Sequence, residues 1–265
     1  MKYLNNILRR FVFKFIFKSI YIYKFGIVIA RYTNFLLPHE EDIHGLTFLQ
    51  LNPNKVIIDV GASDGLYYKS VRYLGIKNKL YAFEPLKENA KHLKKISKKD
   101  KNFKFNSFAL GNKNSKLAIY TPCYKKKYIN NFSSFSKKEC EKNFQMNNFD
   151  INFKNLKFKK TLIKQKKLDS FNFNPALIKI DVEGYEKNVL LGGMRTIKNF
   201  RPAIYVENNK RKSNNVSYFK KKISKFGYTP YMFNFEKKYF IKYSKKNAYM
   251  RDYSYNTYFL TKNHF

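Results

Sequence analysis

The sequence predicts an α/β protein whose ligand site lies where a parallel sheet meets the loops that follow its strands. In the segment VIIDV (56–60), every residue except Asp59 is β-branched and apolar, on both faces, as is typical of a strand buried in a parallel sheet. The glycine-rich turn GASDG (61–65) follows, and an amphipathic helix is expected over 66–75, where Gly75 closes it. A strand, a glycine turn and a helix in this order indicate a nucleotide- or nucleoside-binding unit.

The composition fits one large folded domain with an appendage. The chain has 265 residues, of which 44% are hydrophobic, so it can bury a substantial core and is not expected to be disordered throughout. Its two cysteines, Cys123 and Cys140, lack metal-ligand spacing and cannot form the disulfide framework of a small secreted protein. The sequence therefore predicts a reduced, cytoplasmic chain and no metal site.

The formal net charge is +36, which leaves three explanations open. The charge can come from a general drift toward lysine-rich composition, from attraction to an anionic membrane, or from nucleic-acid binding. The lysines are scattered over several segments rather than gathered in one: 91–101, 124–128, 154–167 and 210–225. This scatter favours a solvated surface over a nucleic-acid-binding groove.

The N-terminal segment is apolar, aromatic and basic. Residues 11–32, FVFKFIFKSIYIYKFGIVIARY, are interrupted by Lys14, Lys18 and Lys24, which a membrane-spanning helix would have to bury at a large cost. The segment also lacks the unbroken apolar core and cleavage site of a signal peptide. Two interpretations stay open: a helix lying in a membrane interface, or a helix packed on the rest of the protein with its lysines pointing outward.

The glycine turn and the second strand favour S-adenosylmethionine over a dinucleotide as the ligand. A dinucleotide site would show G-x-G-x-x-G against a pyrophosphate, whereas here Ser63 occupies the place of the second glycine, between Gly61 and Gly65. The next apolar segment, LYAFEP (80–85), ends in Glu84. A carboxylate at that strand end can accept hydrogen bonds from both ribose hydroxyls.

A pair of carboxylates follows the fourth expected strand, ALIKIDV (176–182). Asp181 and Glu183 stand at its carboxyl end, beside the predicted cofactor, where a base could remove a proton from a hydroxyl group. The alternative is that Asp181 binds the cofactor or orients the turn while Glu183 caps the next helix. Residues 123–160 show no clean period and are predicted to form a lid or an insertion.

The remaining elements are expected from shorter patterns. Strands are predicted over 103–110, 116–122, 201–207, 231–235 and 255–261, and helices over 88–96, 184–199 and 216–226, with a short helix near residues 39–50.

Four sequence blocks resemble the FkbM-type family of S-adenosylmethionine-dependent methyltransferases. In the family's order they are IDVGASDG (58–65), YAFEP (81–85), SFALGNKNSKLAIY (107–120) and LIKIDVEGYEKNVLLGG (177–193), and RPAIYVE (201–207) follows. The resemblance covers roughly residues 54–260. One departure is Ser63, where the family more often has asparagine.

The resemblance implies a Rossmann-like class I methyltransferase fold: a seven-stranded, mostly parallel sheet with its final strand antiparallel and helices on both faces. This domain would span 51–265, behind a basic aromatic N-terminal helical region at 1–50. S-adenosyl-L-methionine would be the cofactor, and Asp181 and Glu183 the catalytic residues. The residues predicted to bind the cofactor are Asp59, Gly61, Ala62, Ser63, Gly65, Glu84, Pro85, Ala109, Leu110 and Asp181.

The resemblance also implies the reaction, which would be O-methylation of a sugar, a glycan or a related small molecule. An RNA methyltransferase and a non-catalytic membrane-surface protein that keeps the fold are the alternatives. The expected partners are the acceptor and an anionic membrane surface contacted through residues 1–32, without specific nucleic-acid binding. Such a protein would lie in the cytoplasm or on the inner face of the membrane.

Overall fold

The computed structural model describes residues 41–145, 152–208, 214–244 and 255–265. The chain divides into two compact units. The larger unit comprises Leu37–Leu117 and Ile163–Phe265, and the smaller unit includes Ala118–Leu162. The predicted N-terminal helix lies outside the described residues, so the prediction for it stays a prediction.

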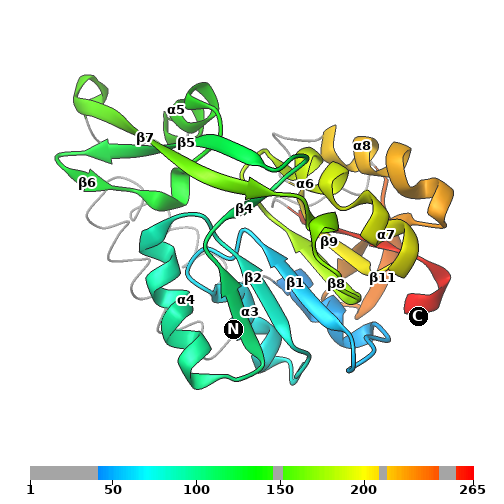
Figure 1. Ribbon diagram of the computed structural model, residues 1–265. Coiled ribbons are helices and arrows are strands. Elements are labelled where there is room, and N and C mark those ends of the chain that lie inside the picture. The colour runs from blue at the N-terminus through cyan, green and yellow to red at the C-terminus, as the bar shows by residue number, and fades with distance from the viewer. Residues whose placement is uncertain (1–40, 146–151, 209–213, 245–254) are drawn as a thin grey trace. The chain divides into compact units, whose positions relative to one another are not determined.

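The larger unit is built on an eight-stranded sheet in the order β11-β10-β12-β9-β8-β1-β2-β3 (Figure 1). The five strands β9, β8, β1, β2 and β3 run parallel to one another, whereas β12 is antiparallel to both β9 and β10. This order confirms a mostly parallel sheet with an antiparallel final strand. The strands are β1 (Val56–Val60), β2 (Leu80–Phe83), β3 (Phe103–Asn106), β8 (Pro175–Ile180), β9 (Ala203–Asn208), β10 (Thr229–Asn234), β11 (Tyr239–Lys242) and β12 (Tyr255–Leu260).

The expected number of seven strands was wrong, because β11 adds an eighth at the edge. It pairs antiparallel with β10 through a short hairpin. In that hairpin the Asn234 side chain accepts a hydrogen bond from the Lys237 backbone N–H at 3.0 Å, and Lys238 has φ of 54°. No residue of β11 is fully buried, so the strand has no strong apolar pattern.

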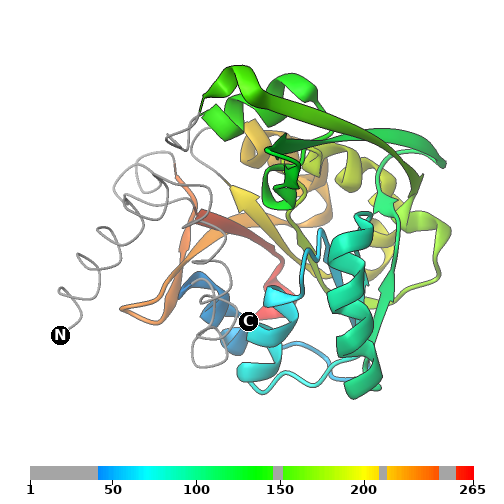
Figure 2. The same ribbon diagram turned by 90° about the vertical axis from the view of Figure 1, so that its left-hand side faces the viewer.

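Helices cover both faces of the main sheet (Figures 1 and 2). One face packs Ile57 and Leu177 against Leu46, Val71 and Leu93, and the other face carries a second apolar core. The first group of helices is η1 (Glu41–Phe48), α3 (Leu66–Tyr73) and α4 (Lys87–Lys99), and the second is α6 (Glu186–Gly192), α7 (Met194–Phe200) and α8 (Asn214–Ile223). Short 3-10 turns complete the unit at η4 (Leu168–Ser170), η6 (Ser224–Phe226) and η7 (Lys262–His264).

The predicted helix over 184–199 is divided into α6 and α7 at Gly192 and Gly193. A Cβ atom on Gly192 would lie 1.8 Å from the carbonyl oxygen of Gly111. The absence of a side chain at Gly192 therefore allows the backbone at Gly111 to approach the end of α6 closely.

The predicted strand over 103–110 is also divided. After β3 the chain leaves the main sheet, and β4 (Ala109–Leu110) pairs parallel with the end of β7 (Leu156–Lys166). Phe108 stacks on Phe171 at 5.9 Å between ring centroids, and Phe171 stacks on Phe173 at 5.3 Å. All three rings contact Phe83 of β2, so this ladder covers the end of that strand.

The smaller unit has more regular structure than the sequence predicted. The helix α5 (Lys137–Gln145) and much of β7 fall inside the segment expected to be irregular, and β5 (Ser115–Tyr124) pairs antiparallel with β6 (Lys127–Tyr128). In the sequence, one 3-10 turn, η2 (Asn130–Phe132), precedes α5, and another, η3 (Phe153–Asn155), follows it. Consecutive lysines such as Lys159 and Lys160 interrupt the alternation by which a strand is recognised. Whether this unit acts as a lid stays a prediction.

In the part of the chain that the structure describes, no helix has the length and apolar character needed to cross a bilayer.

Candidate active site

The turn after β1 is held against β2 by its own backbone. The N–H groups of Gly61 and Ala62 both donate to the carbonyl oxygen of Phe83, at 3.0 and 3.2 Å. Gly61 has φ of 79°, and a Cβ atom there would lie 1.8 Å from the carbonyl oxygen of Asp181. Glycine is therefore required here by the close approach of the loop after β8, in addition to any approach of a ligand.

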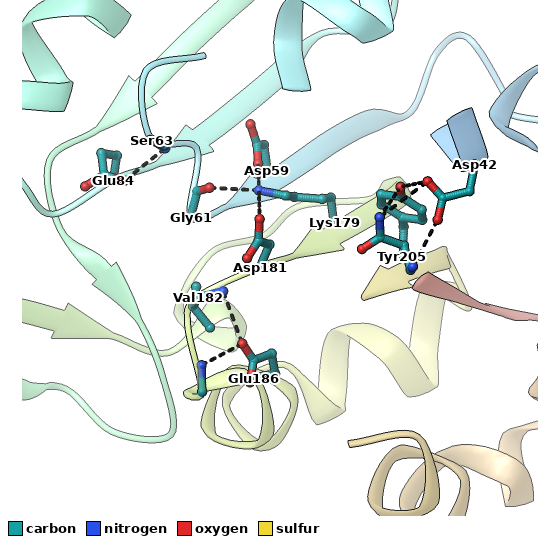
Figure 3. A network of polar contacts seen from close by, with 12 residues as sticks. Asp42, Asp59, Gly61, Ser63, Glu84, Lys179, Asp181, Val182, Glu186 and Tyr205 are labelled. Atoms are coloured by element: carbon teal, nitrogen blue, oxygen red, sulfur yellow. Dashed lines mark hydrogen bonds and ion pairs between the residues drawn. The ribbon is translucent and has the colours of Figure 1, made fainter. Parts of the chain in front are cut away.

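Glu84 joins the same turn to the end of β2. Its Oε2 accepts a hydrogen bond from the Ser63 backbone N–H at 2.9 Å (Figure 3). Its Oε1 accepts one from the Leu86 N–H at 2.8 Å. Burial raises the pKa of Glu84 to about 7, and these hydrogen bonds oppose the rise. The carboxylate predicted to bind a ribose is thus fixed beside the glycine turn.

The other residues of the glycine turn have special backbone conformations or are buried. Ser63 has φ of 48°, a left-handed conformation that serine adopts less readily than glycine or asparagine. Gly65 has φ of 90°, and a Cβ atom there would lie 2.5 Å from the Ile96 side chain on α4. Ala62 is buried.

The buried Lys179 side chain contacts two acidic residues of the site. The Lys179 ammonium nitrogen lies 3.1 Å from Asp59 Oδ1 and 3.7 Å from Asp181 Oδ2, and it donates a hydrogen bond of 2.7 Å to the carbonyl oxygen of Gly61 (Figure 3). Asp59 is completely buried, and burial raises its pKa while Lys179 opposes the rise. The structure thus shows Asp59 as a partner of Lys179, and its direct binding of a cofactor stays a prediction.

The loop after β8 carries both predicted catalytic carboxylates. The side chain of Asp181 is 40% exposed and that of Glu183 is half-buried. Glu183 has φ of 52° and Gly184 has φ of 102°, so two successive residues are left-handed. Strained backbone of this kind is common at functional sites.

Glu186 holds this loop from inside the protein. Its Oε1 accepts hydrogen bonds from the backbone N–H groups of Val182 at 3.3 Å and Gly184 at 2.9 Å (Figure 3). Its Oε2 accepts a third from the Asn215 side chain at 3.1 Å, and its side chain is almost fully buried. Tyr185 adds another tie, because its hydroxyl donates to Gln165 Oε1 at 2.9 Å.

Three further residues were predicted to bind the cofactor: Pro85, Ala109 and Leu110. Pro85 follows Glu84 and is half-buried, while Ala109 and Leu110 are buried in β4. The Leu110 side chain belongs to the core cluster on the α6 face. Their contact with a cofactor stays a prediction. Among the described residues, no group of three or more histidine, cysteine or acidic side chains is arranged to hold a metal ion.

Sequence reasoning missed Lys179 and Glu186. The signal for Lys179 was a lysine inside the otherwise apolar segment PALIKI, because a cation in a strand expected to be buried requires acidic partners. The structure shows all six residues of this strand buried. The signal for Glu186 was an acidic residue two positions after Gly184, in the first turn of a helix.

Comparison with protein families decides what kind of protein carries this site. The family model described as the Methyltransferase FkbM domain matches residues 59–239. The chain belongs to the FkbM methyltransferase family. The matched region contains every residue predicted to bind the cofactor or to act in catalysis.

Solved structures give weaker likenesses. The crystal structure of Methyltransferase FkbM from Methylobacillus flagellatus KT is 15% identical with a TM-score of 0.49, over 78% of this chain and 44% of that chain. This chain thus spans less than half the length of that FkbM relative. A precorrin-6y C5,15-methyltransferase from Geobacter metallireducens GS-15 is 11% identical with a TM-score of 0.41, over 83% of this chain and 87% of that one.

The plantazolicin methyltransferase BpumL, solved in complex with SAH, is 11% identical with a TM-score of 0.39, over 96% of each chain. Likenesses at this level say nothing about the substrate. No curated protein sequence matches the chain significantly.

Proposed function

We propose that this member of the FkbM methyltransferase family uses S-adenosylmethionine to methylate a hydroxyl group. The observation that carries the proposal is the meeting of three loops at one sheet edge. The glycine turn follows β1, Glu84 follows β2, and the Asp181–Gly184 loop follows β8, and these strands are direct neighbours in the order β8-β1-β2. Ligands of open α/β sheets bind outside the carboxyl ends of such strands.

The residues present fit this cofactor. Each oxygen of the Glu84 carboxylate accepts one backbone hydrogen bond, and a carboxylate oxygen can accept a second, here from a ribose hydroxyl. The turn from Gly61 to Gly65 would hold the part of the cofactor beside the ribose, with Pro85, Ala109 and Leu110 near the adenine. When bound, S-adenosylmethionine would supply a methyl group on a positively charged sulfur. As the bond to the acceptor oxygen forms and the sulfur–methyl bond breaks, the sulfur would leave as a neutral thioether, so no acid is needed.

Asp181 is the proposed base. Its side chain is 40% exposed, so an acceptor hydroxyl could reach it, while its ion pair with Lys179 restricts its orientation. Removal of the hydroxyl proton makes the oxygen a better nucleophile. Holding that oxygen in line with the methyl group supplies most of the remaining rate acceleration. Glu183, on the same loop, is the second candidate for this role.

The acceptor that we propose is a sugar or glycan hydroxyl, which rests on the family resemblance of the sequence blocks. The competing acceptor is RNA, which the net charge of +36 would attract without selectivity. The experiment offers purified protein and methyl-labelled S-adenosylmethionine to a lipid and polysaccharide extract and, separately, to total RNA. Label in the extract is expected, while RNA should bind only in a salt-sensitive way. Salt-resistant transfer to one defined RNA would overturn the choice of acceptor.

We also propose attachment to an anionic membrane through residues 1–32. In the described chain, exposed lysines of β7 such as Lys157, Lys159 and Lys164 support an affinity for anionic surfaces. Vesicle sedimentation tests the idea, because binding should require anionic lipid and should be lost when residues 1–30 are deleted. Equal pelleting of the full-length and truncated chains would exclude this role for the segment.

A further inference from the structure

Four groups from four different segments surround the ammonium of Lys179. Asp59 Oδ1 comes from β1, the Gly61 carbonyl oxygen from the turn after it, and Asp181 Oδ2 from the loop after β8. The fourth group is the aromatic ring of Tyr67 on α3, whose centroid lies 5.5 Å from the nitrogen. Lys179 itself lies within β8, and its side chain is 7% exposed.

Charge balance alone does not explain this arrangement. A buried ammonium needs a partner, and the completely buried Asp59 at 3.1 Å already provides one. The hydrogen bond to the Gly61 carbonyl oxygen, at 2.7 Å, is the shortest of the three polar contacts and involves no charged partner. The Asp181 side chain is 40% exposed, so water can solvate its carboxylate and it does not need Lys179 for charge balance.

The two additional contacts join the loops on which the proposed function depends. The Gly61 turn is the proposed cofactor loop, and Asp181 begins the proposed catalytic loop. These loops also approach each other directly, since a Cβ atom on Gly61 would lie 1.8 Å from the Asp181 carbonyl oxygen. The Asp181 backbone N–H donates to the carbonyl oxygen of Val60, the last residue of β1, at 3.1 Å. A single ammonium group thus contacts both loops as well as the buried Asp59 carboxylate.

We infer that Lys179 is a positioning residue that couples the cofactor loop to the catalytic loop, with Asp59 as its buried counter-ion. The inference rests on the proposed function for the roles of the two loops, but the coupling itself is a property of the protein without ligand. Lys179 acts through the Gly61 peptide and the Asp181 carboxylate and does not touch the reacting atoms.

The test separates positioning from charge balance with a pair of variants. Lys179→Met removes the ammonium and leaves Asp59 buried without a cation, so it should lower the melting temperature as well as cofactor affinity. Asp59→Asn combined with Lys179→Met removes both charges and should recover most of the melting temperature. Lys104→Met, an exposed lysine of β3 in the same sheet, is the matched control and should behave as the original protein.

Calorimetric titration with S-adenosylmethionine gives the first readout. The double variant should remain about 10- to 100-fold weaker in affinity than the original protein, because the charged contacts to both loops stay lost. If the double variant instead recovers full affinity together with its melting temperature, Lys179 only balances the charge of Asp59 and the inference is wrong.

Hydrogen exchange in the absence of ligand gives the second readout, which does not depend on the proposed function. In the double variant, amides of residues 61–65 and 181–184 should exchange faster, while the central strands keep their protection. Unchanged exchange in both loops would overturn the coupling. Failure of the original protein to bind S-adenosylmethionine, with faster exchange in the double variant, would contradict the proposed cofactor and leave the coupling supported.

Discussion

The loop after β1 and the loop after β8 are built in the same way. Each contains a residue other than glycine in the left-handed region, Ser63 with φ of 48° and Glu183 with φ of 52°. Each is anchored by a buried glutamate, Glu84 or Glu186, that accepts backbone N–H groups of the loop. The buried carboxylates stabilise conformations that would otherwise be strained.

The loops differ in where their anchor comes from. Glu186 lies two to four residues after its donors, so the loop after β8 is organised by its own sequence. Glu84 directly follows the next strand, β2, and is 21 residues from Ser63, so the loop after β1 depends on the register of β1 and β2. Because the pKa of Glu84 is raised to about 7, this anchor also depends on pH. The Glu84 anchor of the proposed cofactor loop is therefore a long-range contact, whereas the bonds from Glu186 to the backbone of the proposed catalytic loop are local.

The largest effect is expected from Gly61→Ala, which places a methyl group against the Asp181 backbone and breaks the meeting of the two loops. Left-handed strain and overpacking together should cost about 2–5 kcal/mol of the free energy of unfolding. Gly75→Ala is the matched control, since Gly75 has φ of 76° but no atom within 4 Å of the added carbon. That control should cost only about 1–2 kcal/mol. Urea unfolding that gives both variants the same loss would contradict the close approach.

The next effect is the pH dependence of the cofactor loop. The pKa of Glu84 is raised from 4.5 in its ordinary state to about 7 in the folded protein, so the folded state holds this proton more tightly. The contribution to stability is complete below the lower value and is lost as the pH rises toward 7. Relative to Glu84→Gln, the original protein should therefore lose about 2–3 kcal/mol between pH 5 and pH 8. A difference between the two proteins that does not change with pH would refute the raised pKa.

The catalytic loop should respond to Glu186→Ala by losing about 2 kcal/mol of stability, because three hydrogen-bond donors lose their acceptor. Glu186→Gln keeps one acceptor oxygen and should lose less. Thermal unfolding measures both, and hydrogen exchange should place the change in residues 182–184. Equal effects of the alanine and glutamine variants would argue against anchoring through these hydrogen bonds.

The smallest effect is expected from Ser63→Asn. Asparagine adopts the left-handed conformation more readily than serine, so this variant should gain about 0.5 kcal/mol. Ser63→Val should lose stability, because a branched side chain is strained at a positive φ. Denaturant midpoints measure both, and a stabilised valine variant would show that Ser63 is not held in this conformation.

Much of the candidate site could be predicted because each of its strands is a short, buried segment that can be recognised from its own residues. The apolar segments that form β1, β2 and β8 are distinct, and each leads to a carboxylate at or near its carboxyl end, which identified Asp59, Glu84 and Asp181. Parallel strands then bring these ends to one edge, as the structure confirms.

The rest depends on contacts between distant segments. Nothing local specifies that β4 pairs with β7, or that the Lys179 side chain meets both Asp59 and Gly61. The edge strand β11 has no fully buried residue and therefore no strong periodic signal. Such features are fixed by tertiary packing, which a single sequence does not display.

The central claim is that the chain binds S-adenosylmethionine where the cofactor loop meets Glu84. Calorimetric titration of the original protein, Glu84→Ala and the Lys104→Met control tests it most directly. The original and control proteins should bind with equal affinity, and Glu84→Ala should bind about 30- to 150-fold more weakly, a loss of about 2–3 kcal/mol. An original protein that fails to bind, or a Glu84→Ala variant with undiminished affinity, would contradict the account.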